Sequence, residues 1–547
     1  MDMEASKPLA NNESNRQTPY YPTDFPAPQV KPLFSLEKGD FAFGICAIVF
    51  SVFTAVFGIC GGYALGYLIS CLFMMGLFTV YFAKGAAVRF FPVLCGILSI
   101  ANASVFLCTS NGSVRFFGAL VSFLLGLISF GELRSGGAKG NRETLGILYT
   151  AGATINNVGI AIKSLFVNQN GHNKVIGKSL VGFLCAVPLL FIIVPLLISS
   201  DDAFRGMMHN LFGNSTNTLF RAIFGLILSV FVISYGFSLK KERISKAKKS
   251  NLPGIENAYI ISFLSAICVC YLMYLFSQLA YFFSAFSGFL PDGEITYAQY
   301  ARKGFFEMCT IAVINLGIVF LALLIAKKKE GKVCTAIKAL TTFVAVFTLV
   351  IIATAISKMV LYIDVYGMTV LRLTTSAFMV FLGVVFISVI LRIYIVKINI
   401  VKTACVAAGC ILLILGTANV NSICAKYNYE SYISGKLLSV DIDAMYQLGD
   451  EGIPYLVKLA DHENEYVARE ARKYLAQALL YTYFEDLRNE PEFTVSLLQD
   501  KQKNKSFSYF SIPKAAAYES LYSFIEENPN FASQCKELLL EFQNDFF

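Results

Sequence analysis

The sequence predicts an all-α membrane protein, a bundle of about eleven transmembrane helices followed by a small helical domain. Of its 547 residues, 56% are hydrophobic and 15% are charged, and the mean hydropathy is +0.60. In soluble proteins roughly 45–50% of the residues are hydrophobic and about 25% are charged. Apolar runs of about 20 residues, the length that crosses a hydrocarbon layer about 30 Å thick, recur between Phe41 and Val420. A single soluble core cannot accommodate so many such runs.

The first residues differ from the rest of the chain. They are polar and rich in proline, asparagine and tyrosine, without the apolar stretch of a cleavable signal peptide. We therefore expect 1–38 to be a disordered cytoplasmic arm.

Runs of apolar residues between polar breaks define the predicted spans. They lie at 41–59, 63–82, 91–108, 114–131, 180–198, 219–238, 258–283, 305–326, 335–355, 373–396 and 402–420. The segment 145–166 is long enough to cross but contains Asn156, Asn157 and Lys163.

The basic residues of the loops decide this ambiguous segment. With eleven spans and the N-terminus inside, every second loop is basic, including KKERISKAKK at 240–249 and KKKEGK at 327–332. This is the positive-inside pattern. A crossing at 145–166 would place the most basic loops outside, so we interpret this segment as an interfacial or re-entrant helix. The C-terminus then lies outside.

The predicted organisation has five parts. The arm at 1–38 is followed by the first four spans at 39–144, the interfacial or re-entrant segment at 145–179 and a seven-span bundle at 180–424. An acidic helical domain on the exoplasmic side, 425–547, completes the chain. From residue 421 onward the sequence has 12 Lys and Arg against 20 Asp and Glu, a net charge of −8, while the whole chain has +8.

The acidic domain contains one pattern typical of helical repeats. Residues 448–479 predict a helix from Glu451, an acidic turn at 461–464 and a second helix, as in one unit of a HEAT-type repeat. Its predicted inward positions are Pro454, Leu456, Val467, Ala468, Ala471 and Leu475. Further helices are expected near 481–489, 513–527 and 530–545. This domain either caps the bundle or binds a protein partner.

Polar loops on the predicted outer face contain the candidate functional residues. In 199–214, Asp201 and Asp202 precede Arg205; a helix cap and a surface ion pair explain this pattern without catalysis.

The next outer loop, 290–309, ends in a helix. It places Tyr297, Tyr300 and Glu307 on one face, with Lys303 one turn before Glu307 and Arg302 on another side. A carboxylate at the mouth of a span is costly unless it is paired or hydrated, so Glu307 is expected to face the bundle or a cavity.

The third outer loop, 358–373, contains Tyr362, Asp364 and Tyr366, with Arg372 at the start of the next span. Gly367 indicates a break in the chain. Asn315, inside the predicted span 305–326, completes the candidate set.

Three ordered motifs are similar to those of a known family. YAQYARKGFFE (297–307), LYIDVYGMTVLRL (361–373) and VDIDAMYQLGDEGIPYL (440–456) resemble a bacterial multi-spanning membrane family defined by a domain of unknown function. The resemblance implies a protein of the bacterial cell envelope, in the plasma or inner membrane, and implies no reaction.

Several site classes lack support in the sequence. GHNKVIGKS (171–179) has five residues between its glycines where a P-loop has four, so no nucleotide is expected. His172, His209 and His462 lie far apart, and the cysteines fall mostly inside apolar runs, so we expect no metal and no cofactor. No nucleic-acid-binding module accompanies the basic loops.

Three functions fit these observations. The first is a non-enzymatic sensor, regulator or assembly partner with an outward recognition surface. The second is a solute or ion transporter that uses Glu307, Asn315, Asp364 and Arg372. The third is an exoplasmic transferase for a lipid-linked substrate, with Asp201, Asp202 or Glu307 as base or metal ligand. Beyond the lipid bilayer, the expected partner is a protein bound through the C-terminal domain.

Overall fold

The computed structural model describes residues 38–59, 64–82, 89–134, 216–240, 255–287, 305–327, 333–395, 398–479 and 511–531, with a few single residues at 193–200 and 534–538. Within these ranges the chain is helical, and the extended pairing there is an isolated parallel bridge between Ile255 and Ala326. The all-α prediction is confirmed for this part of the chain.

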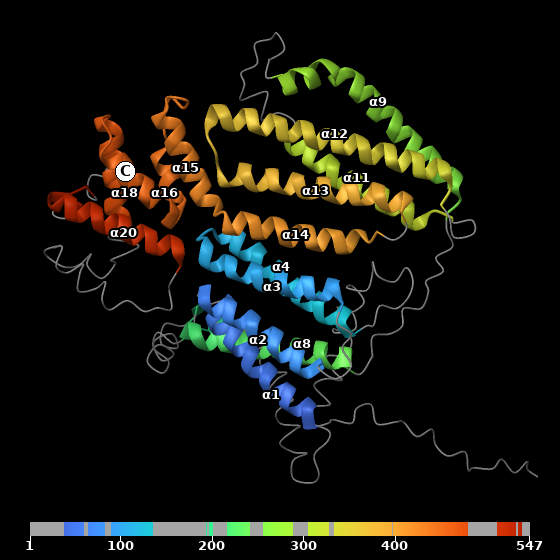
Figure 1. Ribbon diagram of the computed structural model, residues 1–547, viewed down its shortest axis with the longest axis horizontal. Helices are drawn as coiled ribbons and strands as arrows, with labels where there is room; N and C mark the ends of the chain where they lie inside the picture. The colour runs from blue at the N-terminus through green and yellow to red at the C-terminus, as the bar shows by residue number, and fades with distance from the viewer. Residues whose placement is uncertain are drawn as a thin grey trace, which may run out of the picture.

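The helices form two groups, which Figure 1 shows one above the other. The first group, here called the N-terminal bundle, consists of α1 (Lys38–Phe53) with the π-helical turn Thr54–Ile59, α2 (Ala64–Phe82), α3 (Phe90–Cys108), α4 (Gly112–Arg134) and α8 (Thr216–Lys240). The second, the C-terminal bundle, consists of α9 (Asn257–Ser287), α11 (Phe305–Ile325), α12 (Thr335–Tyr366) and α13 (Val370–Tyr394).

Helix α14 (Ile400–Thr417) joins the two bundles, because it packs on α13 on one side and on α3 and α4 on the other. Its contact with α3 and α4 is made by small residues, as is common between membrane helices. A Cβ atom at Gly416 would lie 2.1 Å from Cγ1 of Val105, and one at Gly409 would lie 2.9 Å from Cδ1 of Leu125. The buried Asn102 side chain adds a hydrogen bond from Nδ2 to the Gly409 carbonyl, at 3.1 Å.

Nine of the described helices are long and apolar enough to cross a membrane. They correspond to nine of the eleven predicted spans. The first predicted span, 41–59, is present as a shorter apolar helix, Ala42–Gly58. The predicted span 180–198 and the segment 145–166 lie outside the ranges described.

The predicted loop at 358–373 is the main error in the span boundaries. Helix α12 runs on to Tyr366, and only the turn 367–369 separates it from α13. Met359, Tyr362 and Ile363 continue the face that packs on the neighbouring helices, which extends the helix. It ends at Gly367, whose φ of 76° favours glycine.

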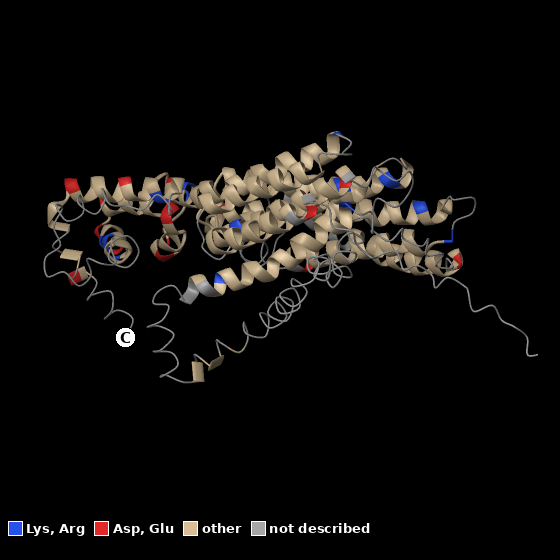
Figure 2. Cartoon of the chain, turned by 90° about the horizontal axis from the view of Figure 1, so that it is seen from below, with Lys and Arg blue, Asp and Glu red and all other residues tan. Residues whose placement is uncertain are grey.

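The C-terminal domain lies at one end of both bundles (Figure 1). It begins with α15 (Val420–Ile433), which follows α14 directly, and continues with α16 (Ile442–Gln447), the 3-10 turn Gly449–Glu451, α17 (Ile453–Ala460), α18 (Glu465–Ala478) and α20 (Ile512–Glu527). Its acidic side chains gather at this end, whereas the spans have few charges (Figure 2). The predicted helix pair on either side of 461–464 and the helix near 513–527 are present.

The apolar core of this domain is continuous with the bundle. Leu456, Leu475 and Phe524 belong to a buried cluster that also includes Val105 of α3 and Val114 of α4. All the predicted inward positions are buried except Pro454, which is half-buried. The C-terminal domain therefore packs on its own bundle, and the contact removes apolar surface of both from water.

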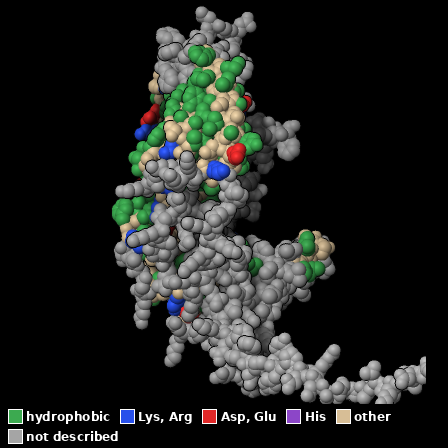
Figure 3. All heavy atoms as spheres, turned by 90° about the vertical axis from the view of Figure 1, so that its right-hand side faces the viewer, with side chains coloured by type: hydrophobic (Ala, Val, Ile, Leu, Met, Phe, Trp, Pro, Cys, Tyr) green, Lys and Arg blue, Asp and Glu red, His purple; other side chains and the backbone are tan. Residues whose placement is uncertain are grey.

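The opposite end of the bundles is fixed by ion pairs. Lys240 lies 2.6 Å from the fully buried Asp40 and joins α8 to α1, while Lys402 lies 3.3 Å from Glu132 and joins α14 to α4. Figure 3 looks onto this end, where the described surface is mostly apolar with several basic side chains. Lys240, from a predicted basic loop, and Lys402 thus share the end away from the C-terminal domain. The assignment of this end to the cytoplasm stays a prediction.

Candidate functional site

Six of the thirteen candidate residues lie in the part of the chain that the structure describes. Asp201, Asp202, Arg205, Tyr297, Tyr300, Arg302 and Lys303 fall outside it. Four of the described six, Tyr362, Asp364, Tyr366 and Arg372, gather where α12 and α13 meet the C-terminal domain.

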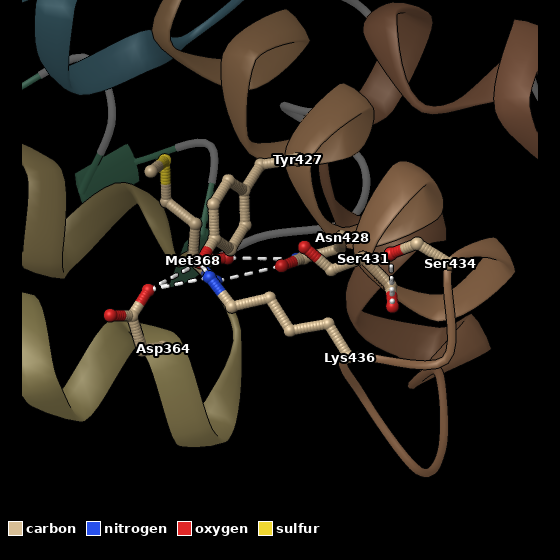
Figure 4. A network of polar contacts seen from close by, with 7 residues as sticks. All are labelled: Asp364, Met368, Tyr427, Asn428, Ser431, Ser434 and Lys436. Atoms are coloured by element: carbon tan, nitrogen blue, oxygen red, sulfur yellow. Dashed lines mark hydrogen bonds and ion pairs between the residues drawn. The ribbon is translucent and has the colours of Figure 1, made fainter.

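The carboxylate of Asp364 is bound from the C-terminal domain. Lys436 places its Nζ 2.7 Å from Oδ1 of Asp364, and the Tyr427 hydroxyl donates to the same oxygen at 3.1 Å. Nζ of Lys436 also donates to the Tyr427 hydroxyl oxygen at 3.1 Å, so the three groups form a closed triangle (Figure 4). The hydrogen bond to Asp364 raises the pKa of the Lys436 ammonium above its ordinary value. Lys436 and Asp364 are both about half exposed, so the ion pair fixes a geometry more than it stabilises the fold.

A second contact fixes the turn between α12 and α13. Asn428 of α15 accepts from the Met368 backbone N–H at 2.7 Å and donates to the Met368 carbonyl at 2.8 Å (Figure 4). These two hydrogen bonds resemble those between paired β-strands, and they satisfy both the backbone N–H and the carbonyl of Met368. A Cβ at Gly367 would lie 2.7 Å from Oδ1 of Asn428, so only glycine permits the approach.

Arg372 closes the same turn from the first turn of α13. Its guanidinium donates to the carbonyls of Tyr366 and Gly367 and lies over the Tyr362 ring, 4.2 Å from the centroid. The Tyr362 and Tyr366 rings lie 5.1 Å apart. Arg372 therefore neutralises the carbonyl end of the α12 dipole and stacks on an aromatic face.

A larger polar site, here called the Glu451 clamp, joins the C-terminal domain to the turn between α3 and α4. Glu451 is buried, and its Oε1 accepts from the Ser110 backbone N–H at 2.7 Å and from the Thr109 hydroxyl at 3.4 Å. Its Oε2 accepts from the Ser110 hydroxyl and from Nδ2 of Asn421, the latter at 3.4 Å. A buried carboxylate needs such donors, because burial without them costs several kcal/mol.

Asparagines complete the clamp. Nδ2 of Asn111 donates to Oδ1 of Asn421 at 2.8 Å, and Oδ1 of Asn111 accepts from the Val114 N–H at 2.9 Å, which caps α4. Nδ2 of Asn419 donates to the Cys108 carbonyl at 2.8 Å, at the end of α3. Asn419 adopts φ 56°, a conformation that asparagine tolerates better than most residues.

The remaining two candidates lie apart from these contacts. Asn315 is buried between helices, where it accepts from the Tyr271 hydroxyl and donates to Thr348 Oγ1 at 2.9 Å. Glu307 was expected to face the bundle or a cavity. Its side chain is exposed, so it does not pack inside the bundle, and a cavity beside it stays a prediction. Phe305, Met308 and Ala312 are buried instead, and their spacing turns Glu307 to the other side of α11.

Two acids, Asp364 and Glu451, make structural contacts between the spans and the C-terminal domain. Asp364 and Glu451 each bind groups from a distant part of the chain, and within the described ranges no three His, Cys, Asp or Glu side chains group as metal ligands would. Asn428, Lys436 and Asn421 were not among the candidates predicted from the sequence. For Asn421 alone a signal exists: amides cluster directly after the last span, at 419–421, and Asn111 lies between the third and fourth spans.

The residues that form these contacts lie within a domain that a family model matches. The family model for Domain of unknown function (DUF4153) matches residues 69–459, from α2 to α17, and so includes all three motifs quoted above. Comparisons with curated proteins and with solved structures give no match. Because the family match covers more than half of the chain, the chain belongs to the family defined by Domain of unknown function (DUF4153).

Proposed function

We propose that this integral membrane protein is a non-enzymatic sensor, regulator or assembly partner, and that its C-terminal domain is the recognition surface. One observation carries the proposal: the C-terminal domain is attached to both bundles at the same end. Glu451 binds the α3–α4 turn of the N-terminal bundle, while Asn428 and Lys436 bind α12 and its turn in the C-terminal bundle.

This double attachment has a mechanical consequence. A ligand that shifts the C-terminal domain must change the positions of the α3–α4 and α12–α13 turns, because each turn is held by hydrogen bonds from that domain. Binding on one side of the membrane is thereby coupled to the helix packing, as a sensor requires. A transporter that rocks one bundle against the other has to open this end, and the clamp opposes that motion.

The exposed face of the C-terminal domain supports recognition of a protein. Tyr466 at the start of α18 is 74% exposed, and the neighbouring Asp461, Glu463 and Glu465 side chains are exposed as well. Aromatic residues are enriched at the centre of protein interfaces, where they bury large areas at little entropic cost.

Photo-cross-linking in intact cells tests the proposal. A photoreactive phenylalanine analogue at position 466 is expected to give a discrete protein adduct, and the same analogue at Val269, an exposed position on α9, is not. The adduct should decrease when Glu463 is replaced by lysine in the same chain. An adduct pattern that is identical at both positions contradicts a specific recognition surface.

Thermal-shift measurements address the small-molecule alternatives. Purified protein is screened against ions, lipids and lipid-linked sugars, with Glu307→Gln and Asp364→Asn as comparison variants. Stabilisation of the wild type by a solute, abolished in Asp364→Asn, would overturn the proposal in favour of transport or transfer.

A further inference from the structure

The loop 434–438, which follows α15, exposes a leucine completely. Leu438 is 100% exposed, and Ile433 at the end of α15 is 50% exposed. Burial of apolar surface is favourable, so two exposed aliphatic side chains at either end of one fixed loop raise the question of what covers them.

The loop is held in this conformation by its other residues. Leu437, the residue before, is buried and donates its N–H to the Ser431 carbonyl at 2.9 Å. A Cβ atom at Gly367 would lie 3.4 Å from Cδ1 of Leu437, so the Leu437 side chain packs on the α12–α13 turn. Lys436 is attached to Asp364, and Gly435 turns the chain with φ 74° (Figure 4). With these anchors in place, Leu438 cannot fold back into the core.

The same anchors fix the depth of the loop relative to the bilayer. Asp364, the partner of Lys436, lies two residues before the end of the span Thr335–Tyr366. The last residues of that span and the first of the next are apolar or aromatic and exposed: Val365 at 45%, Tyr366 at 50% and Leu371 at 62%. Tyrosine at the end of a span is typical of the membrane–water interface. The loop therefore lies beside the end of a candidate span.

We propose that the 434–438 loop docks on the bilayer that surrounds the protein, with Leu438 and Ile433 inserted at the boundary of headgroups and acyl chains. The occupant of this apolar surface is lipid, because Lys436 and Leu437 attach the loop to the ends of α12 and α13, whose own exposed residues Val365 and Leu371 are apolar. Lys436 holds the loop at this depth through Asp364, with its aliphatic stem along the surface. The C-terminal domain then has a third attachment, to the membrane itself.

The absence of tryptophan from the sequence permits a direct test. Leu438→Trp introduces a single fluorescent reporter, and Tyr466→Trp does the same on α18, which lies farther from the bundles than α15 (Figure 1). Both variants are reconstituted as full-length protein in liposomes, with and without lipids brominated on their acyl chains. We expect blue-shifted emission from Leu438→Trp, with strong quenching by brominated lipid, and neither effect for Tyr466→Trp.

Two results would overturn the proposal. One is emission from Leu438→Trp at the wavelength of water-exposed tryptophan without quenching, which means that the loop faces water or a protein. The other is equal quenching of both reporters, which means that the whole domain lies on lipid. Thermal unfolding checks the fold of each variant. If Leu438→Trp does not fold, Ile433→Trp at the other end of the loop replaces it, with the same expected quenching.

Discussion

The carboxylate of Glu451 accepts a hydrogen bond from the backbone N–H of Ser110 at 2.7 Å, although 341 residues separate the two in the sequence. Ser110 belongs to the short turn between two membrane helices, and Glu451 to the first part of the C-terminal domain. This buried contact is one of several that join the N-terminal bundle to the C-terminal domain. The buried core that surrounds it, with Val105 and Val114 against the leucines of α17 and α18, excludes water from the hydrogen bonds.

Removal of this carboxylate should loosen the C-terminal domain. Glu451→Ala leaves the Ser110 N–H and Nδ2 of Asn421 with fewer acceptors in a buried site, and we expect a loss of about 3 kcal/mol in the free energy of unfolding. Denaturant titration in mixed micelles measures the loss, and limited proteolysis should cut the domain from the bundle faster. Glu463→Ala, at an exposed position of the same domain, is the control.

A double-mutant cycle separates the contact from a general effect of the substitution. Ser110→Ala removes the hydroxyl that donates to Oε2 of Glu451 but retains the backbone N–H. We expect Ser110→Ala to cost less in the Glu451→Ala background than in the wild type, with a coupling of about 0.5–3 kcal/mol. Strict additivity would show that the two residues do not interact in the folded protein.

Gly367 should tolerate no side chain. Its φ of 76° and ψ of 176° belong to a region that is almost restricted to glycine, and the new Cβ would lie 2.7 Å from Oδ1 of Asn428. We expect Gly367→Ala to lower the free energy of unfolding by about 1–3 kcal/mol or more. Gly317→Ala, on α11 with open space around its Cβ, should instead be neutral or stabilising by up to about 1 kcal/mol. Equal effects of the two substitutions would contradict the role of the turn.

In the contact between α14 and α3, a second substitution should partly restore the stability that a first one removes. Gly416→Ala would place its Cβ 2.1 Å from Cγ1 of Val105, and such overpacking costs about 1–3 kcal/mol. Val105→Ala removes both methyl groups that clash. The double variant should therefore be more stable than the sum of the two losses implies, as measured by thermal unfolding in detergent. A double variant that simply sums both losses would mean that α14 does not pack on α3 at this point.

The spans were predictable because their length and apolarity are properties of continuous segments. The helix ends were less predictable. Residues 358–366 contain Lys358 and Asp364, which are typical of a loop, yet the packing of Met359 and Ile363 extends α12 through this segment. Tertiary contacts outweighed local polarity there. The exposure of Glu307 could not be predicted, because its local sequence gives no information on which face of α11 is buried.

The candidate site was predictable only in part. Tyr362, Asp364, Tyr366 and Arg372 were recognised as a group because they lie within eleven residues of one another. Tyr427 and Lys436, which bind Asp364, come from another domain, as does Asn428, which binds the adjacent Met368 backbone. Pairing across 60 or more residues leaves no periodic pattern in a single sequence. The hydrogen bonds of the Glu451 clamp also join distant residues and could not be predicted from the sequence. Glu451 was predicted to begin a helix, and it lies in the 3-10 turn before α17.

The contact of Lys436 with Asp364 should make stability depend on alkaline pH. The pKa of the Lys436 ammonium is raised above 10.5 by its hydrogen bond to Asp364, so the folded state retains this proton more tightly than the unfolded state. The stabilisation is complete below 10.5 and is lost as the pH rises through the raised pKa. We therefore expect the difference in Tm between wild type and Lys436→Met to be constant at neutral pH and to shrink above 10.5. Lys426→Met, next to Glu430 on α15, controls for other groups that titrate there. A difference that is unchanged or wider at alkaline pH would mean that the ammonium of Lys436 does not bind Asp364 in solution.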